Sequence, residues 1–454
     1  MMSQTRLPAL PLVVNDPYFS IWCAADCLTD ADTTHWAGDE KPVRGVLTID
    51  GEAYRFLGVG DFPAMETVAQ TVTPTATYVT ARAAGVQLEI RFTTPLLLSD
   101  WDTLSTPITM VDFAAQSIDG QAHTISLALH ATDALCYNGA ERPDMMADAY
   151  RLGTLSVAYT GQRGQKVLCH SGDHITIDWG YLYLASPSPV CPETQGLAMH
   201  WQTKLMAEER RTTYVLLGYD DIASIQYFGT PTKAWYARGG QTFPEALSRF
   251  AARHDALLQQ CEAFDAQLLA DARAMGGEDY ALIVAAAYRQ TIGAHKLIAD
   301  AQGKPVLLSK ENDSNGCAGT VDVSYPSTPL FLRYAPELVR AMCRPVLHFA
   351  MLPVWPFDFA PHDVGRYPQA TGQVYGVNRR AECEGDSGNV YPPYYLYPAG
   401  TDCYRLADQM PVEECGNMLV MLAAAAAQDG DLSLVRTYRP LLAKWVEYLM
   451  IYGE

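Results

Sequence analysis

The chain lacks the sequence patterns that mark several common classes of protein. It has no run of about 18 apolar residues, the length that a membrane-spanning helix needs, so we expect no membrane segment. Basic residues are scarce, with 32 Lys and Arg against 51 Asp and Glu and a formal net charge of −19 at pH 7. Because binding to phosphates requires clustered Lys and Arg, this balance excludes nucleic acids and anionic membranes as expected partners.

Cysteine pairs, metal-binding motifs and nucleophile motifs are also absent. The 11 cysteines are an odd number and include no C-x-x-C pair, which disfavours a disulfide scaffold and a zinc site. Neither H-E-x-x-H nor H-x-H occurs, so we expect no metal and no cofactor. One alternative is a calcium ion bound by oxygens of the polar turn Glu311–Asn315, which lacks EF-hand spacing. Without a G-x-S-x-G motif, a serine nucleophile is not expected.

The N-terminus begins with a short apolar stretch that Pro8 and Pro11 interrupt. It contains no continuous apolar segment and no small-residue cleavage site, so the sequence predicts no signal peptide. Together with the unpaired cysteines, this favours a cytoplasmic protein whose thiols are mostly buried and reduced. The sequence leaves the oligomeric state undetermined.

The pattern of apolar residues divides the chain into an N-terminal part and a C-terminal part. A chain of 454 residues is expected to form two or three domains. Between residues 42 and 229, short alternating apolar runs are separated by turn residues, and Asp50–Gly51 is a hairpin signal between two such runs. This pattern predicts an antiparallel β-sandwich in residues 1–240.

From about Thr242 the apolar residues recur at helical spacing. The glycines at 276 and 277 predict an αα-hairpin between two long helices, and further helices are expected around 336–351, 412–428 and 434–452. The sequence therefore predicts an (α/α) toroid in residues 241–454. Because they contain fewer helices than six hairpins require, we expect this helical domain to be truncated.

Several stretches together resemble the glutaminase A-like family, which joins an N-terminal β-sandwich region to a six-hairpin, glycosidase-like toroid. The matching stretches follow the family order along the chain: P-L-V-V-N-D-P-Y-F-S-I-W, T-H-W-A-G, V-T-P-T-A-T-Y, F-T-T-P-L-L-L-S-D, S-I-Q-Y-F-G, A-Y-R-Q, S-K-E-N-D-S-N-G, T-V-D-V-S-Y-P-S-T-P-L-F-L, F-A-P-H-D-V-G-R-Y-P, G-Q-V-Y-G and M-P-V-E-E-C-G-N-M. The resemblance implies a hydrolase, with glutaminase activity known for some fungal members. The chain differs from the secreted members of this family because its sequence predicts no signal peptide.

Candidate catalytic residues lie where loops precede the predicted helices. Glu413 and Glu414 open a helix after Pro411, and adjacent helical residues point about 100° apart, so one of the two is expected to face a ligand. The alternative is that acidic residues in a first helical turn complement the helix dipole, but the preceding polar loop and the following Gly416 and Asn417 favour a functional role. His362 and Asp363 lie in a turn beside aromatic residues, where Asp363 could equally form an Asx-turn.

Asp322 and several polar or aromatic residues of the neighbouring loops are further candidates. Asp322 is expected between valines on a strand, where a buried carboxylate needs a partner. We assign Glu413 and Asp363 as the acid/base pair, with Glu414 and Asp322 as further catalytic carboxylates. The remaining candidates are assigned to substrate binding: His362, Asn417, Glu311, Asn312, Trp355 and Tyr375.

The favoured reaction is hydrolysis of a small polar substrate by carboxylate acid/base catalysis, with the side-chain amide of L-glutamine implied by the family. One alternative is hydrolysis of a short oligosaccharide by two carboxylates. A second alternative is a carbohydrate-binding or scaffold protein without catalytic activity.

Overall fold

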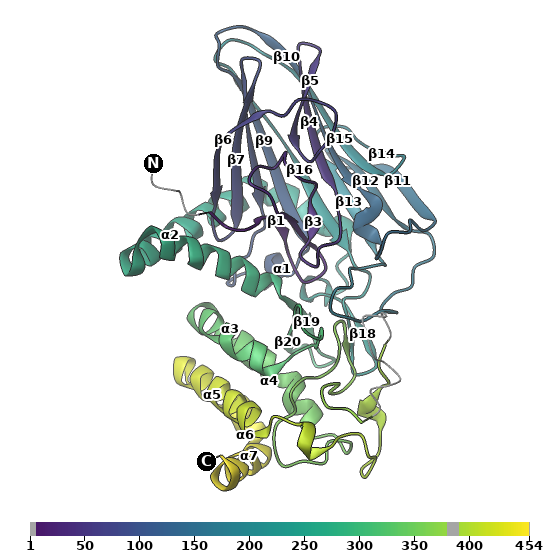
Figure 1. Cartoon of the computed structure of the whole chain (residues 1–454), viewed down its shortest axis with the longest axis vertical. Helices are drawn as coiled ribbons and strands as arrows, with labels where there is room; N and C mark the ends of the chain where they lie inside the picture. Colours follow the sequence, from purple (N-terminus) through teal and green to yellow (C-terminus); the bar gives the residue numbers. More distant parts are fainter. Residues whose placement is uncertain (1–5, 379–389, 454) are drawn as a thin grey trace.

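Two antiparallel sheets form the N-terminal half of the molecule, as the sequence predicts (Figure 1). The computed structural model describes residues 6–378 and 390–453. The smaller sheet has the strand order β14 (Val190–Glu193), β15 (Gly196–Leu205), β10 (His123–Thr132), β4 (Val43–Ile49) and β5 (Glu52–Leu57). The larger has the order β11 (Met145–Leu152), β12 (Leu155–Gln162), β13 (Tyr181–Ser186), β16 (Arg210–Asp220), β9 (Ile108–Ser117), β8 (Val86–Thr93), β7 (Ala76–Ala83) and β6 (Glu66–Val72).

The two sheets pack face to face because alternate residues on their strands are apolar. In β10 the buried residues Leu127 and Leu129 alternate with partly exposed ones, the period-two pattern of a strand with one covered face. Phe56 of β5 meets Phe113 of β9 with ring centroids 5.8 Å apart, which joins the sheets across the core. Asp50 and Gly51 both have positive φ between β4 and β5, as a tight hairpin turn requires.

Smaller elements connect the sandwich to the rest of the chain. A three-stranded sheet contains β1 (Leu10–Val14), β2 (Ser20–Cys23) and β3 (Thr34–His35), and another contains β18 (Thr230–Thr232), β17 (Ile225–Tyr227) and β21 (Gln369–Ala370). Short helical turns are α1 (Trp101–Leu104), η1 (Asp133–Cys136), η2 (Trp235–Ala237), η4 (Tyr394–Leu396) and η5 (Leu406–Asp408). Because β21 pairs in parallel with β17, the long loop that follows α4 is fastened to the end of the sandwich region.

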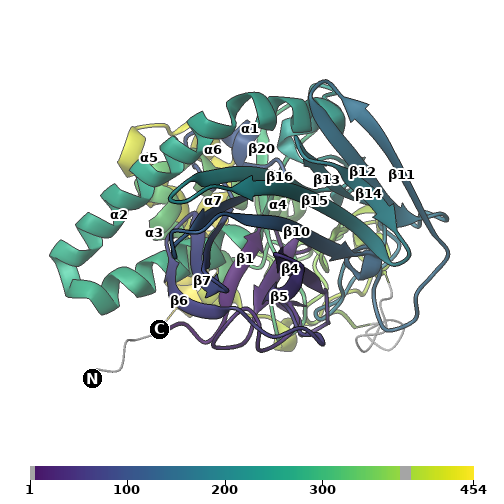
Figure 2. The same ribbon diagram turned by 90° about the horizontal axis from the view of Figure 1, so that it is seen from above.

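The helix α2 (Phe243–Gly293) contains the predicted αα-hairpin. Its backbone leaves helical geometry at Gly277, with φ 79° and ψ −170°. Phe264 and Tyr288, 24 residues apart, have ring centroids 5.2 Å apart, whereas a straight helix would separate them by about 36 Å. The chain therefore reverses at Gly277, and Figure 2 shows the bend at the end of α2 furthest from β11. The first arm covers the outer face of the eight-stranded sheet through Phe243, Leu247 and Phe250.

The reversal gives a stability prediction for Gly277. Its φ and ψ lie in a region that essentially only glycine adopts, so we expect Gly277→Ala to lower the free energy of unfolding by about 1–3 kcal/mol. Gly416→Ala is the matched control: it lies inside a helix with open space around its Cβ position, and alanine there should be stabilising by about 0.5–1 kcal/mol. Urea unfolding followed by circular dichroism measures both. Equal effects of the two substitutions would show that the Gly277 conformation is not required.

The remaining helices form a layer beside the sandwich. They are α3 (Val321–Tyr334), α4 (Pro336–Ala350), α5 (Pro411–Asp429), α6 (Ser433–Thr437) and α7 (Arg439–Tyr452), and the hairpin of β19 (His295–Ala299) and β20 (Pro305–Ser309) separates them from α2. The predicted strand around Asp322 is wrong, because this segment is the first turn of α3. Packing of α3 against α4 and α5 overrides the β-branched residues and two internal prolines that made it look extended.

A buried ion triad joins the two halves of the chain. The Nζ of Lys296 in β19 lies 2.7 Å from Oδ2 of Asp16 and 2.8 Å from Oδ2 of Asp221, and all three side chains are largely buried. Asp16 also accepts hydrogen bonds from the backbone N–H groups of Tyr18 and Phe19. Burial alone would raise the pKa of Asp16, but the Lys296 charge and these hydrogen bonds outweigh it and lower that pKa. Asp16 is therefore ionised at neutral pH and pairs with the Lys296 cation.

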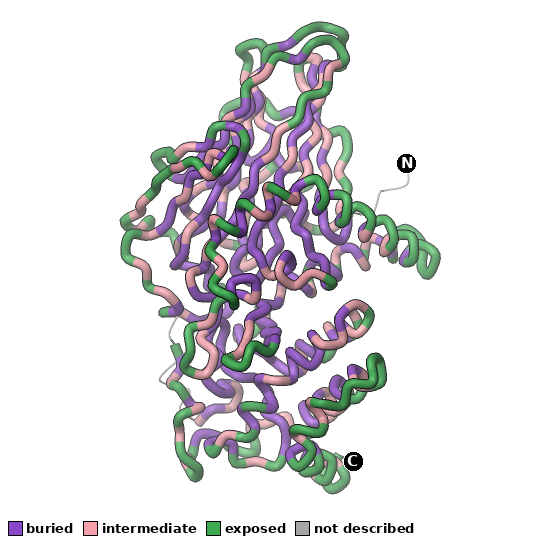
Figure 3. The backbone as a smooth tube through the Cα atoms, turned by 180° about the vertical axis from the view of Figure 1, so that it is seen from behind, coloured by how far each residue is buried: buried purple, intermediate pink, exposed green. Residues whose placement is uncertain are grey.

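Buried residues run without a break from the sandwich into the helical layer, as Figure 3 shows from behind. Along residues 6–378 and 390–453, no helix combines the length and the apolar character needed to cross a bilayer. The change from strand to helix falls between Thr232 and Phe243. The division into residues 1–240 and 241–454 stays a prediction.

Candidate functional site

Three segments that are distant in sequence bring two carboxyl groups and an imidazole together. Asp322 lies in the first turn of α3, His362 in the loop after α4, and Glu414 in the first turn of α5. One potential ligand atom from each lies within 4.8 Å of the others, and the Nε2 of His362 is 3.9 Å from Oδ2 of Asp322. Glu414 is only 1% exposed, whereas the Asp322 side chain is 31% exposed. The cluster is therefore buried at one side and open to solvent at Asp322.

Asp363 fixes the orientation of the His362 ring. Its Oδ2 accepts a hydrogen bond from Nδ1 of His362 at 3.0 Å, which leaves Nε2 directed to other partners. The Asp363 carboxylate also accepts from three backbone N–H groups at 2.9–3.1 Å, namely those of Gly365, Val374 and Tyr375. Asp363 is completely buried, and these four bonds lie within its own loop. This environment suits a positioning residue better than the proton-transfer role assigned to Asp363 from the sequence.

Further contacts hold the face of the His362 ring and the backbone of the same residue. The ring of Tyr375 stacks on that of His362, with centroids 4.2 Å apart and planes inclined by 19°. The side-chain oxygen of Gln373 accepts a hydrogen bond from the backbone N–H of His362 at 2.7 Å, and Tyr404 donates to the backbone oxygen of Gln373. Gln373 stands in the G-Q-V-Y-G stretch but is not among the residues predicted from sequence. The ring is thus held before any ligand arrives.

Burial sets the charge state of Glu414, and Asp363 sets that of His362. Burial raises the pKa of Glu414 to about 9, against the lowering effect of the His362 charge, and the negative charges of Asp322, Glu413 and Asp363 add to the rise. Neither carboxyl oxygen of Glu414 has a hydrogen-bond partner among the described residues. Burial would lower the pKa of His362, but the hydrogen bond and charge of Asp363, with Glu414 and Asp322, raise it to about 9. At neutral pH, Glu414 is therefore a protonated acid beside an imidazolium.

Glu311 lies at the edge of this cluster. It is partly buried, and burial raises its pKa, with smaller opposing effects from a hydrogen bond to Ser314 and from the His362 charge. Its Oε2 is buried and has no hydrogen-bond partner among the described residues. The neighbouring Asn312 is exposed. Calcium binding by this turn stays a prediction.

Metal binding at the cluster itself would oppose these charge states. Asp322, His362 and Glu414 are close enough to share an ion, as are Cys317, His362 and Asp363. A cation would need a neutral imidazole and ionised carboxylates. Burial and Asp363 favour an imidazolium and a protonated Glu414 instead. These charge states suit proton transfer, and a bound cation would have to displace the protons of His362 and Glu414.

The other predicted residues lie at different distances from the cluster. Glu413 is exposed, so α5 turns Glu414 rather than Glu413 toward His362. Asn417 is half-buried and follows Glu414 by three residues, which places both on one side of α5. Trp355 is buried and donates from Nε1 to the backbone oxygen of Phe359 at 2.9 Å. Trp355 therefore packs in the aromatic core, while substrate binding by Asn417 stays a prediction.

Comparison with known families covers nearly the whole chain. Residues 277–453 match the glutaminase A six helical-hairpin domain. Residues 1–70 match a domain of unknown function, DUF4964, and residues 75–208 and 189–271 match another, DUF5127. A glutaminase A of Aspergillus oryzae is 26% identical over 501 residues, covering 99% of this chain and 67% of that protein. The chain belongs to the glutaminase A-like family. The fold of this glutaminase A-like chain agrees with that assignment, since a sheet-rich region precedes the helical-hairpin domain.

Two further relatives are more distant or more local. A probable glutaminase of Arthroderma benhamiae is 34% identical over 156 residues, which covers 34% of the glutaminase A-like chain and 15% of that protein. A solved structure described as a kojibiose phosphorylase from human microbiome has a TM-score of 0.46 and 10% identity, and covers 90% of this chain and 49% of its own. That likeness carries no conclusion about substrate or activity. This chain spans only part of each of these proteins.

Proposed function

We propose that this glutaminase A-like chain is a hydrolase of a small polar substrate, with Glu414 as the general acid and Asp322 as the general base. The observation that carries the proposal is the buried Glu414 carboxyl, whose pKa burial raises, close to the more exposed Asp322 carboxylate. Two carboxyl groups in environments that differ this much are suited to opposite roles in proton transfer. The curated relative named glutaminase A supports L-glutamine as the substrate.

The proposed reaction hydrolyses the side-chain amide of glutamine. Asp322 accepts a proton from water as the water oxygen attacks the amide carbon, and the carbonyl oxygen becomes an oxyanion. The Nε2–H of His362, fixed by Asp363, stabilises that negative charge. Glu414 then donates its proton to the amide nitrogen as the carbon–nitrogen bond breaks. The products are glutamate and ammonia, and the proton taken up by Asp322 returns to Glu414 through solvent.

Glycoside hydrolysis is the second candidate, because two carboxyl groups this close are nearer the retaining than the inverting separation of glycosidases. Asp322 and Glu414 each have an oxygen within 4.8 Å of the other. Retaining glycosidases hold their acid and nucleophile about 5–5.5 Å apart, so Asp322 would attack the sugar carbon and Glu414 would protonate the leaving oxygen. The same two residues therefore serve both candidate reactions.

A paired activity screen separates these candidates. The chain is tested for ammonia release from L-glutamine and for cleavage of a panel of aryl glycosides, beside Asp322→Asn and Glu414→Gln. Ammonia release that both substitutions abolish supports the amide reaction, and glycoside cleavage without ammonia release assigns the second candidate. Sugar binding without either turnover would instead support a carbohydrate-binding or scaffold protein and would contradict the proposed hydrolase.

The pH dependence of turnover tests the charge state of Glu414. An acid with a pKa of about 9 keeps its proton at neutral pH and loses it as the pH rises, so we expect kcat/KM to fall through pH 9. Asp363→Asn removes a negative charge beside the His362 ring. If His362 contributes to the alkaline limb of the kcat/KM profile, that limb should move in this variant. A profile whose alkaline limb lies near the ordinary glutamate pKa of about 4.3 would contradict the role of Glu414 as the acid.

A further inference from the structure

The outer face of the five-stranded sheet gathers four side chains of the kinds that bind metals. Cys191 and Glu193 are alternate residues of β14, so they share one face. Cys191 and His130 both pair with Ala198 of β15, and His200 follows Ala198 on the same face. Three strands therefore contribute to one cluster, far in the fold from Glu414.

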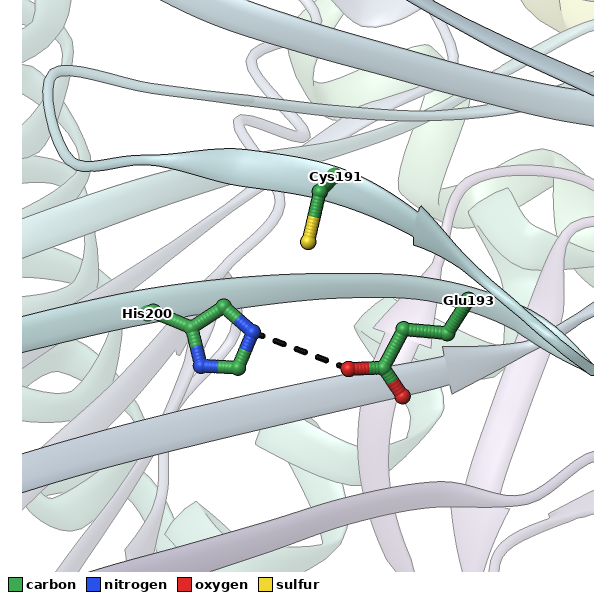
Figure 4. Close-up of side chains that lie close together, drawn as sticks. All are labelled: Cys191, Glu193 and His200. Atoms are coloured by element: carbon green, nitrogen blue, oxygen red, sulfur yellow. Dashed lines mark ion pairs between the residues drawn. The ribbon is translucent and has the colours of Figure 1, made fainter.

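The side chains of this cluster already point toward one another. One ligand atom each from Cys191, Glu193 and His200 lies within 4.8 Å of the others, and Figure 4 shows the sulfur, carboxylate and ring converging. The Nε2 of His200 is 3.6 Å from Oε1 of Glu193, and the Nδ1 of His130 is 3.1 Å from Oε2 of Glu193. The two imidazole rings are 6.2 Å apart and nearly perpendicular. The carboxylate thus bridges two histidines, with a thiol beside it.

This set of ligands matches a zinc-class ion. Cysteine, histidine and carboxylate are the usual zinc ligands, at about 2.0–2.3 Å in a tetrahedron, which places ligand atoms about 3.3–3.8 Å apart. The ligand atoms of Cys191, Glu193 and His200, within 4.8 Å of one another, would need to move closer. The ring of His130, now 3.1 Å from Glu193, would have to turn toward the same point, and all four side chains are at least partly exposed. A cation binds the thiolate form of cysteine, so metal binding at this site would release the proton of Cys191.

The surroundings leave one side of the cluster accessible. His130 and Glu193 also line a groove of about 620 Å³ that extends along β4 and β5. An ion could enter from this groove, and water could complete its coordination there. Surface ion pairs would account for the position of His130 and His200 beside Glu193. They would not account for the position of the Cys191 thiol in the same cluster.

We propose that Cys191, Glu193, His200 and His130 form a site for a divalent transition metal of the zinc class. Because β14 is an edge strand of its sheet, the ion would fasten this edge to β15 and β10. The C-x-x-C and H-x-H spacings are absent because the ligands come from neighbouring strands of a sheet. The proposal is independent of the proposed hydrolase reaction, since no member of the cluster lies near Asp322 or Glu414 in the fold.

Metal titration of the full chain tests the proposal. After treatment with a chelator under reducing conditions, the protein is titrated with Zn²⁺ by calorimetry and with Co²⁺ by absorption spectroscopy. We expect one Co²⁺ equivalent with a near-ultraviolet thiolate-to-cobalt charge-transfer band. Cys191→Ser should remove the band, and His200→Gln should weaken Zn²⁺ binding at least about tenfold, since even outer-shell substitutions cost about 10–100-fold. Zn²⁺ should raise the Tm of the unsubstituted chain but not that of Cys191→Ser.

Two matched control variants show whether the cobalt band and the zinc affinity come from this cluster. Cys169→Ser removes an exposed thiol elsewhere, and Glu414→Gln alters the other carboxylate–histidine cluster, so both should retain the band and the affinity. A band that persists in Cys191→Ser, or Zn²⁺ affinity that His200→Gln leaves unchanged, would overturn the assignment. Failure of the unsubstituted chain to bind either ion at micromolar concentration would also overturn it. Circular dichroism confirms that each variant is folded.

Discussion

Replacing Glu414 with glutamine is expected to lower turnover of L-glutamine by about 10²–10⁴-fold, the contribution of a positioned general acid. Glutamine has nearly the same shape as a protonated carboxyl group, which is the form that burial favours at this position. The substitution should therefore leave folding almost unchanged while it removes the transferable proton. Initial rates of ammonia release, compared at matched protein concentration, measure the effect, and KM should change less than kcat.

Glu413→Gln is the matched control for this prediction. It makes the same chemical change one residue earlier on α5, but Glu413 is exposed and turned away from His362. We expect its turnover to stay close to that of the unsubstituted chain. A large loss in Glu413→Gln with little loss in Glu414→Gln would reverse the assignment and restore the acid that the sequence analysis favoured.

Replacing Lys296 with methionine is expected to destabilise the chain by about 3–5 kcal/mol, because two buried carboxylates would lose their shared cation. Asp16 and Asp221 would then repel each other where little water reaches them. The triple variant Lys296→Met/Asp16→Asn/Asp221→Asn removes every charge of the triad and should recover part of the loss. Urea unfolding followed by tryptophan fluorescence measures the midpoint, with the first transition used if the two halves unfold separately.

The contrast with an exposed pair isolates the effect of burial. Lys444 lies 2.8 Å from Asp358, but both side chains are more than half exposed. Water and salt screen such a pair, so Lys444→Met should leave the midpoint unchanged. If Lys296→Met behaved in the same way, the triad would not be what fastens β19 to the sandwich.

Local sequence patterns were sufficient to predict much of the fold. Alternation of apolar residues indicated the sandwich, and Asp50–Gly51 and Gly276–Gly277 marked two reversals that the structure contains. These signals work because they depend on a residue and its immediate neighbours. Asp322 shows their limit: valines and prolines around it suggest an extended chain, and only contacts with α4 and α5 make that segment helical.

The candidate site could be located from sequence but its roles could not be assigned. Adjacent helical residues differ by about 100° in direction, so choosing between Glu413 and Glu414 requires knowing where α3 and His362 lie. The position of Asp363 likewise depends on backbone N–H groups eleven and twelve residues later in the chain, at Val374 and Tyr375. No local pattern reports such partners. The identity of the substrate is a proposal for the same reason: substrate specificity depends on residues brought together from several segments of the chain.

The carboxylate of Asp363 has a consequence for the energetics of ligand binding. By joining Val374 and Tyr375 to the turn at Gly365, it closes residues 363–375 into a ring held by hydrogen bonds. A loop that is ordered before the ligand arrives spends no binding energy on losing its own freedom. Affinity should then depend mainly on contacts with the ligand, and binding should change the hydrogen-exchange rates of the Val374 and Tyr375 amides very little.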